Sequence, residues 1–219
     1  MSFLTTQFTY THTSVIVLPS NDSINAKTAL QTAVSIVHHH PSMCYLVPVL
    51  KNVQLLDPPP TPPPVDVSAL QNSFTLTSSE DAWKYYELKD ELPMFGGWYT
   101  HHLTYHAAIR NLMHGMESLV QAPSNVTIHA VWDVSLQRRR RVAVAGNVIE
   151  EGDGELCLVL TETSVIRCGK HLAWYIRGSL ERNHNVMHDG FRVNWEEKMG
   201  IRPEGKEAEG KGEGLGKEM

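Results

Sequence analysis

The fold is decided by residues 170–197, which read KHLAWYIRGSLERNHNVMHDGFRVNWEE. Apolar or neutral side chains recur here every three or four residues, which is the spacing of one face of an α-helix. Gly190 interrupts this stripe and is a candidate for a bend. A long amphipathic helix needs a large apolar surface to cover, and a curved sheet would provide one. The stripe and its two flanking residues are Leu172, Tyr175, Ile176, Ser179, Leu180, Asn183, Met187 and Phe191.

The preceding chain predicts such a sheet. In residues 98–113 the odd positions, from Tyr99 to Ile109, are more apolar than the even ones, so the odd face should point inward. A further short strand is expected just before Ala122. Strand-like composition or alternation also marks residues 7–18, 83–92, 126–136 and 156–165.

The remaining segments complete an α+β pattern. Residues 25–39 predict a helix, whereas residues 42–56 allow an interrupted strand or a short helix. The proline-rich stretch within residues 54–75 predicts a stiff extended surface loop, with partner binding as the alternative. Residues 201–219 contain mostly Glu, Lys and Gly and predict a disordered tail. We therefore expect one domain over residues 1–200, in which a curved antiparallel sheet wraps around the C-terminal helix.

Composition argues against several classes of protein. The formal net charge of −5 disfavours nucleic acid as a partner. No apolar run reaches the ~18–20 residues that a membrane-spanning helix needs. Cys44, Cys157 and Cys168 form no CxxC pattern, which disfavours a disulfide framework or a zinc knuckle. The first residues lack the pattern of a secretion signal, so we expect a cytoplasmic protein. A monomer and a homodimer both stay open.

The chain resembles the START and polyketide-cyclase superfamily, whose fold is called helix-grip, and within it an uncharacterised fungal branch. The resemblance spans roughly residues 7–195 and includes the order of the expected elements. No single motif in it is diagnostic. The matching stretches are FTYTHT at residues 8–13, WKYYELKD at 83–90, APSNVTI at 122–128 and IRGSLERNH at 176–184.

This resemblance implies a deep cavity between the sheet and the long helix. Superfamily members carry lipids, bind hormones or cyclise polyketides, and some small fungal proteins in natural-product clusters are pericyclases. The resemblance therefore implies a cofactor-independent cyclase that acts on an apolar terpenoid or polyketide intermediate. Its most specific form is a norbornene-forming Diels–Alderase of the sordarin type. The alternative is a lipid or sterol carrier without turnover.

One strand supplies the candidate catalytic residues. His101 shares the expected inward face with Tyr99 and Tyr105, so it could donate a hydrogen bond or act as a general base. The alternative is a core histidine that is bonded to a neighbouring tyrosine. Side chains with a large apolar area or a single polar group are expected to bind the ligand. These are Tyr86, Leu88, Leu103, Trp132, Tyr175, Ser179 and Asn183.

The other histidines and a search for catalytic motifs indicate no further type of reaction. His184 and His188 have the i, i+4 spacing of a zinc site, but no third ligand is evident, so we expect exposed helix histidines and no metal. The chain contains no nucleophile elbow, dinucleotide-binding glycine motif or phosphate-binding loop. Reactions that need only shape and a few hydrogen bonds fit this pattern best, and they require no cofactor.

Overall fold

The computed structural model describes residues 4–19, 24–68, 82–94, 98–139 and 154–201. Seven strands and three helices form this part of the chain. The strands are β1 (Thr5–Val17), β2 (Leu50–Leu55), β3 (Lys84–Met94), β4 (Tyr99–Leu112), β5 (Gly115–Ala122), β6 (Val126–Arg139) and β7 (Glu155–Gly169). The helices are α1 (Ala26–Val37), α2 (His40–Cys44) and α3 (Ala173–Lys198).

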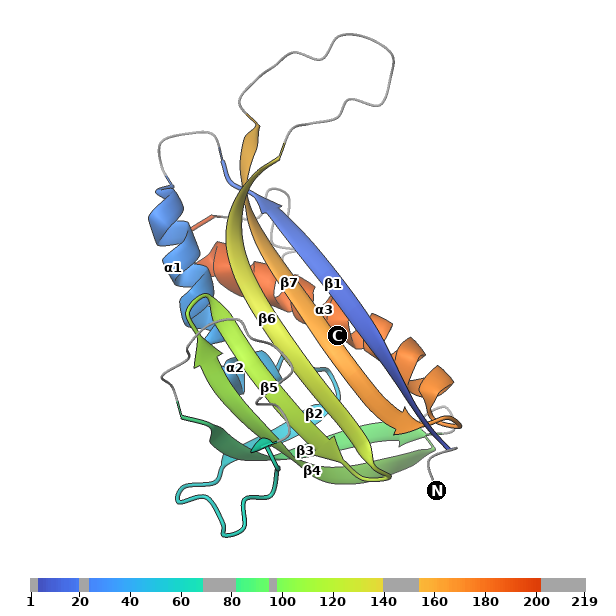
Figure 1. Ribbon diagram of the computed structural model, residues 1–219. Coiled ribbons are helices and arrows are strands. Elements are labelled where there is room, and N and C mark those ends of the chain that lie inside the picture. The colour runs from blue at the N-terminus through green and yellow to red at the C-terminus, as the bar shows by residue number, and fades with distance from the viewer. Residues whose placement is uncertain (1–3, 20–23, 69–81, 95–97, 140–153, 202–219) are drawn as a thin grey trace, which may run out of the picture.

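All seven strands belong to one antiparallel sheet in the order β1-β7-β6-β5-β4-β3-β2. Strands β2 to β7 follow one another as neighbours, and β1 pairs with β7 to form the opposite edge. Figure 1 shows β1, β6 and β7 running side by side along the length of the molecule. The expected α+β class is therefore confirmed.

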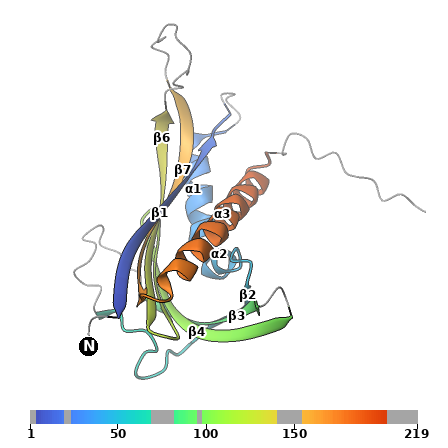
Figure 2. The same cartoon turned by 90° about the vertical axis from the view of Figure 1, so that its right-hand side faces the viewer.

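The sheet is strongly curved, and the helices lie on its concave side. Figure 2 shows β3 and β4 turned almost across the direction of β6 and β7, with α2 and α3 above them. This is a helix-grip-like arrangement of a bent sheet around a long C-terminal helix. Curvature places side chains from both halves of the sheet opposite the same helix.

The C-terminal half of α3 holds the helix onto the rest of the core. Phe191 and Trp195 are completely buried, and the indole nitrogen of Trp195 donates a 3.0 Å hydrogen bond to the backbone oxygen of Ala29 on α1. Gly190 does not interrupt the helix. An added Cβ at Gly190 would lie 2.8 Å from the side chain of Leu46, so the glycine permits a close approach between α3 and the chain after α2.

Two ambiguous segments are now assigned. Residues 42–56 contain the end of α2 and then β2, so the predicted short helix and the predicted strand are each confirmed for a part of that stretch. The short strand expected before Ala122 is β5. Period-two alternation could not separate α2 from a strand, because the helix has only five residues.

The proline-rich segment runs along the surface beside the convex face of the sheet. Its prolines from 58 to 63 are exposed, whereas Val65 is fully buried against Ala108 and Leu119. Residues 69–75 of the expected loop and residues 202–219 of the expected tail lie outside the described residues. Among the helices that the structure describes, none is both long enough and apolar enough to span a membrane.

Candidate functional site

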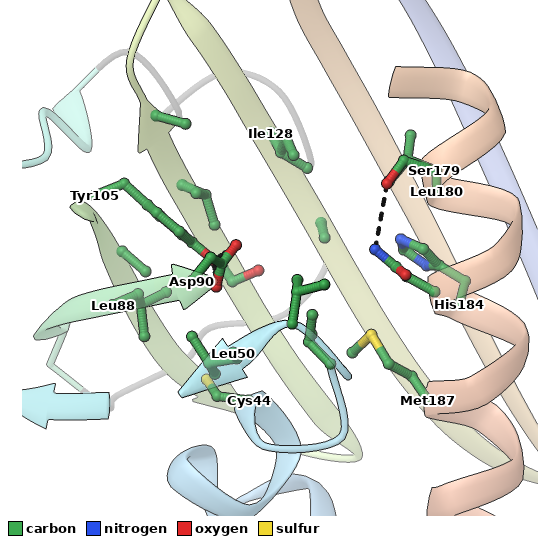
Figure 3. A pocket seen from close by; sticks show the side chains of 18 of the residues that line it. Cys44, Leu50, Leu88, Asp90, Tyr105, Ile128, Ser179, Leu180, His184 and Met187 are labelled. Atoms are coloured by element: carbon green, nitrogen blue, oxygen red, sulfur yellow. Dashed lines mark hydrogen bonds between the residues drawn. The ribbon is translucent and has the colours of Figure 1, made fainter. Parts of the chain in front are cut away.

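A cavity of about 300 Å³ lies between α3 and the concave face of the sheet. Apolar side chains from β3 to β6, the α2–β2 segment and α3 form most of its wall. Figure 3 shows side chains of the sheet and of α3 facing each other across this space. The volume lies at the lower end of the range for small-molecule sites, which are mostly apolar with a few placed polar groups.

Seven of the ten side chains expected to act or bind line this cavity. The inward face assigned to β4 agrees with the structure, because Leu103, Tyr105, Ala107 and Ile109 all face the cavity. Tyr175 is 45% exposed and therefore lies where the cavity opens to solvent. The seven residues are Leu88, Leu103, Tyr105, Trp132, Tyr175, Ser179 and Asn183.

Tyr99 and His101 do not line the cavity, contrary to their expected position, and both are exposed. They share the parity of Tyr105, but β4 pairs with β5 only from His106 onward. The first part of β4 is therefore the arm of a hairpin with β3 that extends past the sheet. Alternation correctly predicts which face of a strand is apolar. It cannot show at which residue the packing over that face ends.

Tyr86 is buried but lies outside the cavity wall. Its hydroxyl is 3.0 Å from Nδ1 of His40, and the other ring nitrogen of His40 lies 2.8 Å from Oδ1 of Asn111. Burial raises the pKa of Tyr86 to about 12. The α2 helix covers this end of β3, so Tyr86 belongs to the packing between α2 and the sheet.

On the sheet side of the cavity, the main polar group is the pair Asp90 and Tyr105. The Tyr105 hydroxyl donates to the carboxylate, with 3.1 Å to each oxygen. Burial raises the pKa of the Asp90 carboxyl, and the hydrogen bond from Tyr105 opposes this rise without cancelling it. Figure 3 shows the two side chains meeting at the cavity wall, opposite α3. The pair offers hydrogen-bonding groups to a ligand in an otherwise apolar surrounding.

On the helix side, a buried carboxylate holds a histidine. Glu162 on β7 is 2% exposed and hydrogen-bonds Nδ1 of His184 on α3. Both residues line the cavity. The Ser164 hydroxyl donates to the other carboxylate oxygen at 2.8 Å. Burial alone would raise the pKa of Glu162, but the neighbouring imidazoles of His184 and His188, together with Ser164, hold it below its ordinary value. Glu162 is therefore an ionised group inside the protein.

Behind this pair, His188 connects α3 to the edge strand. Its Nε2 is 3.8 Å from the same Glu162 oxygen that binds His184, and its Nδ1 is 2.7 Å from the Ser14 hydroxyl on β1. His12 of β1 packs edge-on against the His188 ring, with centroids 4.2 Å apart. Residues of two strands and one helix thus form one continuous polar group.

Trp132 places the histidines against the sheet. Its indole stacks on His184 with ring planes 10° apart and lies 5.1 Å from the ring of His188. In the sheet register Trp132 is the partner of Glu162 on one side, and His12 is the partner on the other. The register therefore puts the carboxylate between an indole and an imidazole, directly below α3.

The prediction that His184 and His188 are exposed is wrong, since only 7% and 2% of their surfaces are accessible. The helical stripe was centred one residue away from His184, on Asn183, which is half-buried and hydrogen-bonds Ser179 at 3.4 Å. A signal was present in β7. Glu162 has the same parity as Leu158, Leu160 and Ile166, so a charged residue stood on an apolar face and needed a partner.

A second buried ionic group lies away from the cavity. Glu117 accepts hydrogen bonds from Arg110 at 2.7 Å and from His129 at 2.8 Å. The Arg110 guanidinium also lies over the Trp83 ring, 4.6 Å from its centroid. None of these residues lines the cavity, so we read this group as part of the packing of the convex face.

Within the described residues, no three His, Cys, Asp or Glu side chains are arranged so that they could hold a metal ion. The cavity instead offers two carboxylate-centred pairs on opposite walls, Asp90–Tyr105 and Glu162–His184. Such groups can orient a ligand, donate hydrogen bonds or transfer protons.

A family model described as "Domain of unknown function (DUF7053)" matches residues 7–197. The chain belongs to the DUF7053 family. The match covers all seven strands and three helices of the described chain, except for the first two residues of β1 and the last residue of α3.

This DUF7053 chain was also compared with solved structures and with curated proteins. Among 27 matching chains of solved structures is an uncharacterised protein from Rhizobium leguminosarum, with 7% identity and a TM-score of 0.39. That match covers 89% of this chain and 99% of the other. Comparison with the curated proteins finds no significant match.

Proposed function

We propose that this protein is a cofactor-independent cyclase that folds an apolar terpenoid or polyketide intermediate for an intramolecular cycloaddition. The observation that carries the proposal is the cavity of about 300 Å³, whose mainly apolar wall contains the Asp90–Tyr105 pair. A uniformly apolar wall would suit a carrier equally well. Polar groups placed at one point of the wall favour an enzyme, because they can act on one reacting centre.

The cavity would accelerate such a reaction mainly by shape. The cavity would hold the diene and the dienophile of one flexible molecule in contact, in an orientation that is rare in solution. Such positioning can lower the activation barrier by about 7–11 kcal/mol in the best intramolecular cases. Two carbon–carbon σ bonds form at the expense of two π bonds, and no atom leaves, so no co-reactant is needed.

Asp90 and Tyr105 would supply the electronic part. A carbonyl on the dienophile gains negative charge as the bonds form, and a fixed donor stabilises that charge. The Tyr105 hydroxyl donates to Asp90, and in its protonated form the Asp90 carboxyl would in turn be a donor toward the ligand. Burial favours the protonated form, because it raises the pKa of Asp90.

The narrowest form of the proposal is a norbornene-forming Diels–Alder reaction of the sordarin type. It rests on the resemblance of the sequence to fungal members of the START and polyketide-cyclase superfamily. A non-catalytic carrier of a lipid or sterol is the second candidate. The predominantly apolar wall and the exposed Tyr175 at the opening favour that candidate.

Native mass spectrometry tests both candidates. The purified protein is incubated with an organic extract of its source organism, and the released ligand is compared with the starting extract by chromatography and NMR. The carbon skeleton must be compared, because an intramolecular cycloaddition leaves the mass unchanged. The matched control is Ala107→Leu, which fills part of the cavity.

A bound terpenoid or polyketide with a rearranged skeleton, absent with Ala107→Leu, is the result expected for a cyclase. A sterol or fatty acid that is bound and released unchanged would overturn the cyclase and support the carrier. The absence of any ligand specific to the unfilled cavity would overturn both.

A further inference from the structure

The cycloaddition makes no use of the Glu162–His184 pair, although both side chains line the cavity. Glu162 is one of the most deeply buried ionisable groups of the described chain. Placing a carboxylate in an apolar interior costs several kcal/mol unless charged or hydrogen-bonding partners compensate. Binding an apolar ligand does not require a buried carboxylate and histidine, so this pair points to a further role of the cavity.

The geometry leaves one nitrogen of His184 for a ligand. Nδ1 is engaged by Glu162, and an ionised carboxylate can only accept, so Nδ1 carries the proton. Within the described residues, no group hydrogen-bonds Nε2 of His184. The Trp132 indole stacks on the ring and restricts its orientation. Figure 3 shows the side chain projecting from α3 at the cavity, beside Leu180 and Met187.

A fixed anion on one imidazole nitrogen is the arrangement that supports proton transfer at the other. The carboxylate selects the tautomer in which Nε2 is a free base, and it stabilises the imidazolium that forms when Nε2 accepts a proton. Ser164 holds the second carboxylate oxygen and limits rotation of Glu162. The pair is therefore prepared for proton transfer at Nε2, the ring nitrogen that Glu162 does not engage.

His188 extends the polar group toward solvent. It lies beside the same Glu162 oxygen, and its Nδ1 meets Ser14 on β1, which is the edge strand of the sheet. His12 of that strand is only partly buried and packs on His188. His188 and Ser14 thus lie between the interior carboxylate and the sheet edge, and within the described residues Nε2 of His188 makes no hydrogen bond of its own.

We propose that the cavity is a proton-transfer site, in which His184 is the general base toward an acidic C–H bond of an apolar carbonyl compound and Glu162 is its positioning residue. Nε2 takes the proton from the carbon next to the carbonyl group. The C–H electron pair becomes the double bond of an enolate, and the carbonyl π pair moves to oxygen. In a β,γ-unsaturated carbonyl compound this enolate is a conjugated dienolate. The imidazolium gives the proton to the γ-carbon, the oxygen pair re-forms the carbonyl group, and the double bond moves from the β,γ to the α,β position. The base is regenerated without any oxidant or cofactor.

The inference rests on the same cavity as the proposed function, in that both require an apolar ligand to enter. It does not require a cycloaddition. A chromogenic probe can therefore test it separately. In 5-nitrobenzisoxazole, a base removes the ring C–H proton, the C–H pair completes a nitrile, and the N–O bond breaks with its electron pair on oxygen. The ring-opened product is a coloured cyanophenolate. Equilibrium dialysis of the same compound measures whether it enters the cavity.

Wild-type protein should eliminate the probe about 100-fold faster than buffer that contains an equal concentration of free imidazole, as expected for a positioned base. His184→Gln should lose this rate while it still binds the probe. The matched control is His102→Gln, a histidine on an exposed part of β4, and it should keep the wild-type rate. A probe that binds but is not eliminated by wild-type protein would overturn proton transfer and leave the proposed cyclase standing.

A second measurement needs no stable variant of His184. Long-range ¹H–¹⁵N NMR of wild-type protein should show His184 protonated at Nδ1 when neutral. Glu162→Gln should give a mixture of tautomers, because a side-chain amide can either accept from the ring nitrogen or donate to it. The titratable side chains around the ring are Glu162, His188, His12 and Tyr10, so their variants assign the observed signals. A neutral His184 that carries its proton on Nε2 in the wild-type protein would overturn the proposal.

Discussion

The hydroxyl of Tyr105 lies 3.1 Å from each carboxylate oxygen of Asp90, and both residues line the cavity. Leu88 is the register partner of Tyr105, and Asp90 follows two residues later on the same face of β3. The diagonal position on neighbouring strands brings the hydroxyl onto the carboxylate. Without this hydroxyl, the cavity wall around Asp90 would offer its charge little compensation.

Asp90→Asn should raise the stability of the protein at neutral pH. Burial holds the pKa of Asp90 above its ordinary value of 3.8, so this group favours the folded state below that pH and loses its contribution as pH rises through the folded pKa. The neutral amide removes the penalty that applies at pH 7. Thermal unfolding at pH 7 and pH 3 should show a gain at pH 7 that shrinks toward pH 3. An equal change at both pH values would contradict the explanation.

Glu162→Gln should destabilise the protein by about 1.5–3 kcal/mol, the range for a hydrogen bond to a charged group. The pKa of Glu162 is held below 4.5, so its contribution is present above pH 4.5 and is lost as pH falls through the folded pKa. Urea unfolding across pH 3–7 measures both effects. The matched control is Glu91→Gln, whose 3.8 Å pair with His102 is exposed and should contribute less than about 1 kcal/mol.

Ala107→Leu and Ala108→Leu should separate the cavity from the packed face of β4. Ala107 lines the cavity, so the larger side chain has room, and Nile red binding should weaken by at least about tenfold, or 1.4 kcal/mol. Ala108 is fully buried against Val65 and Leu119, where overpacking costs about 1–3 kcal/mol. Dye fluorescence should therefore respond to Ala107→Leu, and urea unfolding should respond to Ala108→Leu. Destabilisation by Ala107→Leu without loss of dye binding would contradict the cavity.

Gly115→Ala should destabilise severely, by more than about 3 kcal/mol. The added Cβ would lie 1.8 Å from the backbone oxygen of Trp132, so the β5–β6 pairing would have to open. Gly178→Ala is the comparison, because outside the backbone of its own helix no atom of a packing neighbour lies within 4 Å of the new Cβ, and alanine favours a helix interior by about 1 kcal/mol. Thermal unfolding of the two variants should shift in opposite directions.

The overall architecture follows from local pattern. Alternation in β4 and β6 and the helical stripe of α3 each identify an apolar face, and the only compact way to bury these faces is against one another. The prediction of a curved antiparallel sheet around a C-terminal helix is confirmed for this reason. The predicted inward positions of Leu103, Tyr105 and Trp132 follow from the same periodicity.

The limits of each element were harder to predict. The β3–β4 hairpin continues beyond the last residue that pairs with β5, so Tyr99 and His101 are exposed although their parity is correct. The face to which a strand residue points depends only on its position within that strand. Whether that face is buried depends on where a helix far away in the sequence crosses the sheet.

The periodicity of the sequence shows which faces of the strands and of the last helix are apolar, because those faces repeat at the period of a strand or a helix. Which polar groups meet inside depends on the tertiary structure. Glu162 joins His184 across 22 residues, and Ser14 joins His188 across 174. These contacts depend on sheet register and on the rotation of α3, and both are set by the packing of the whole core around residues such as Trp195 rather than by any local period.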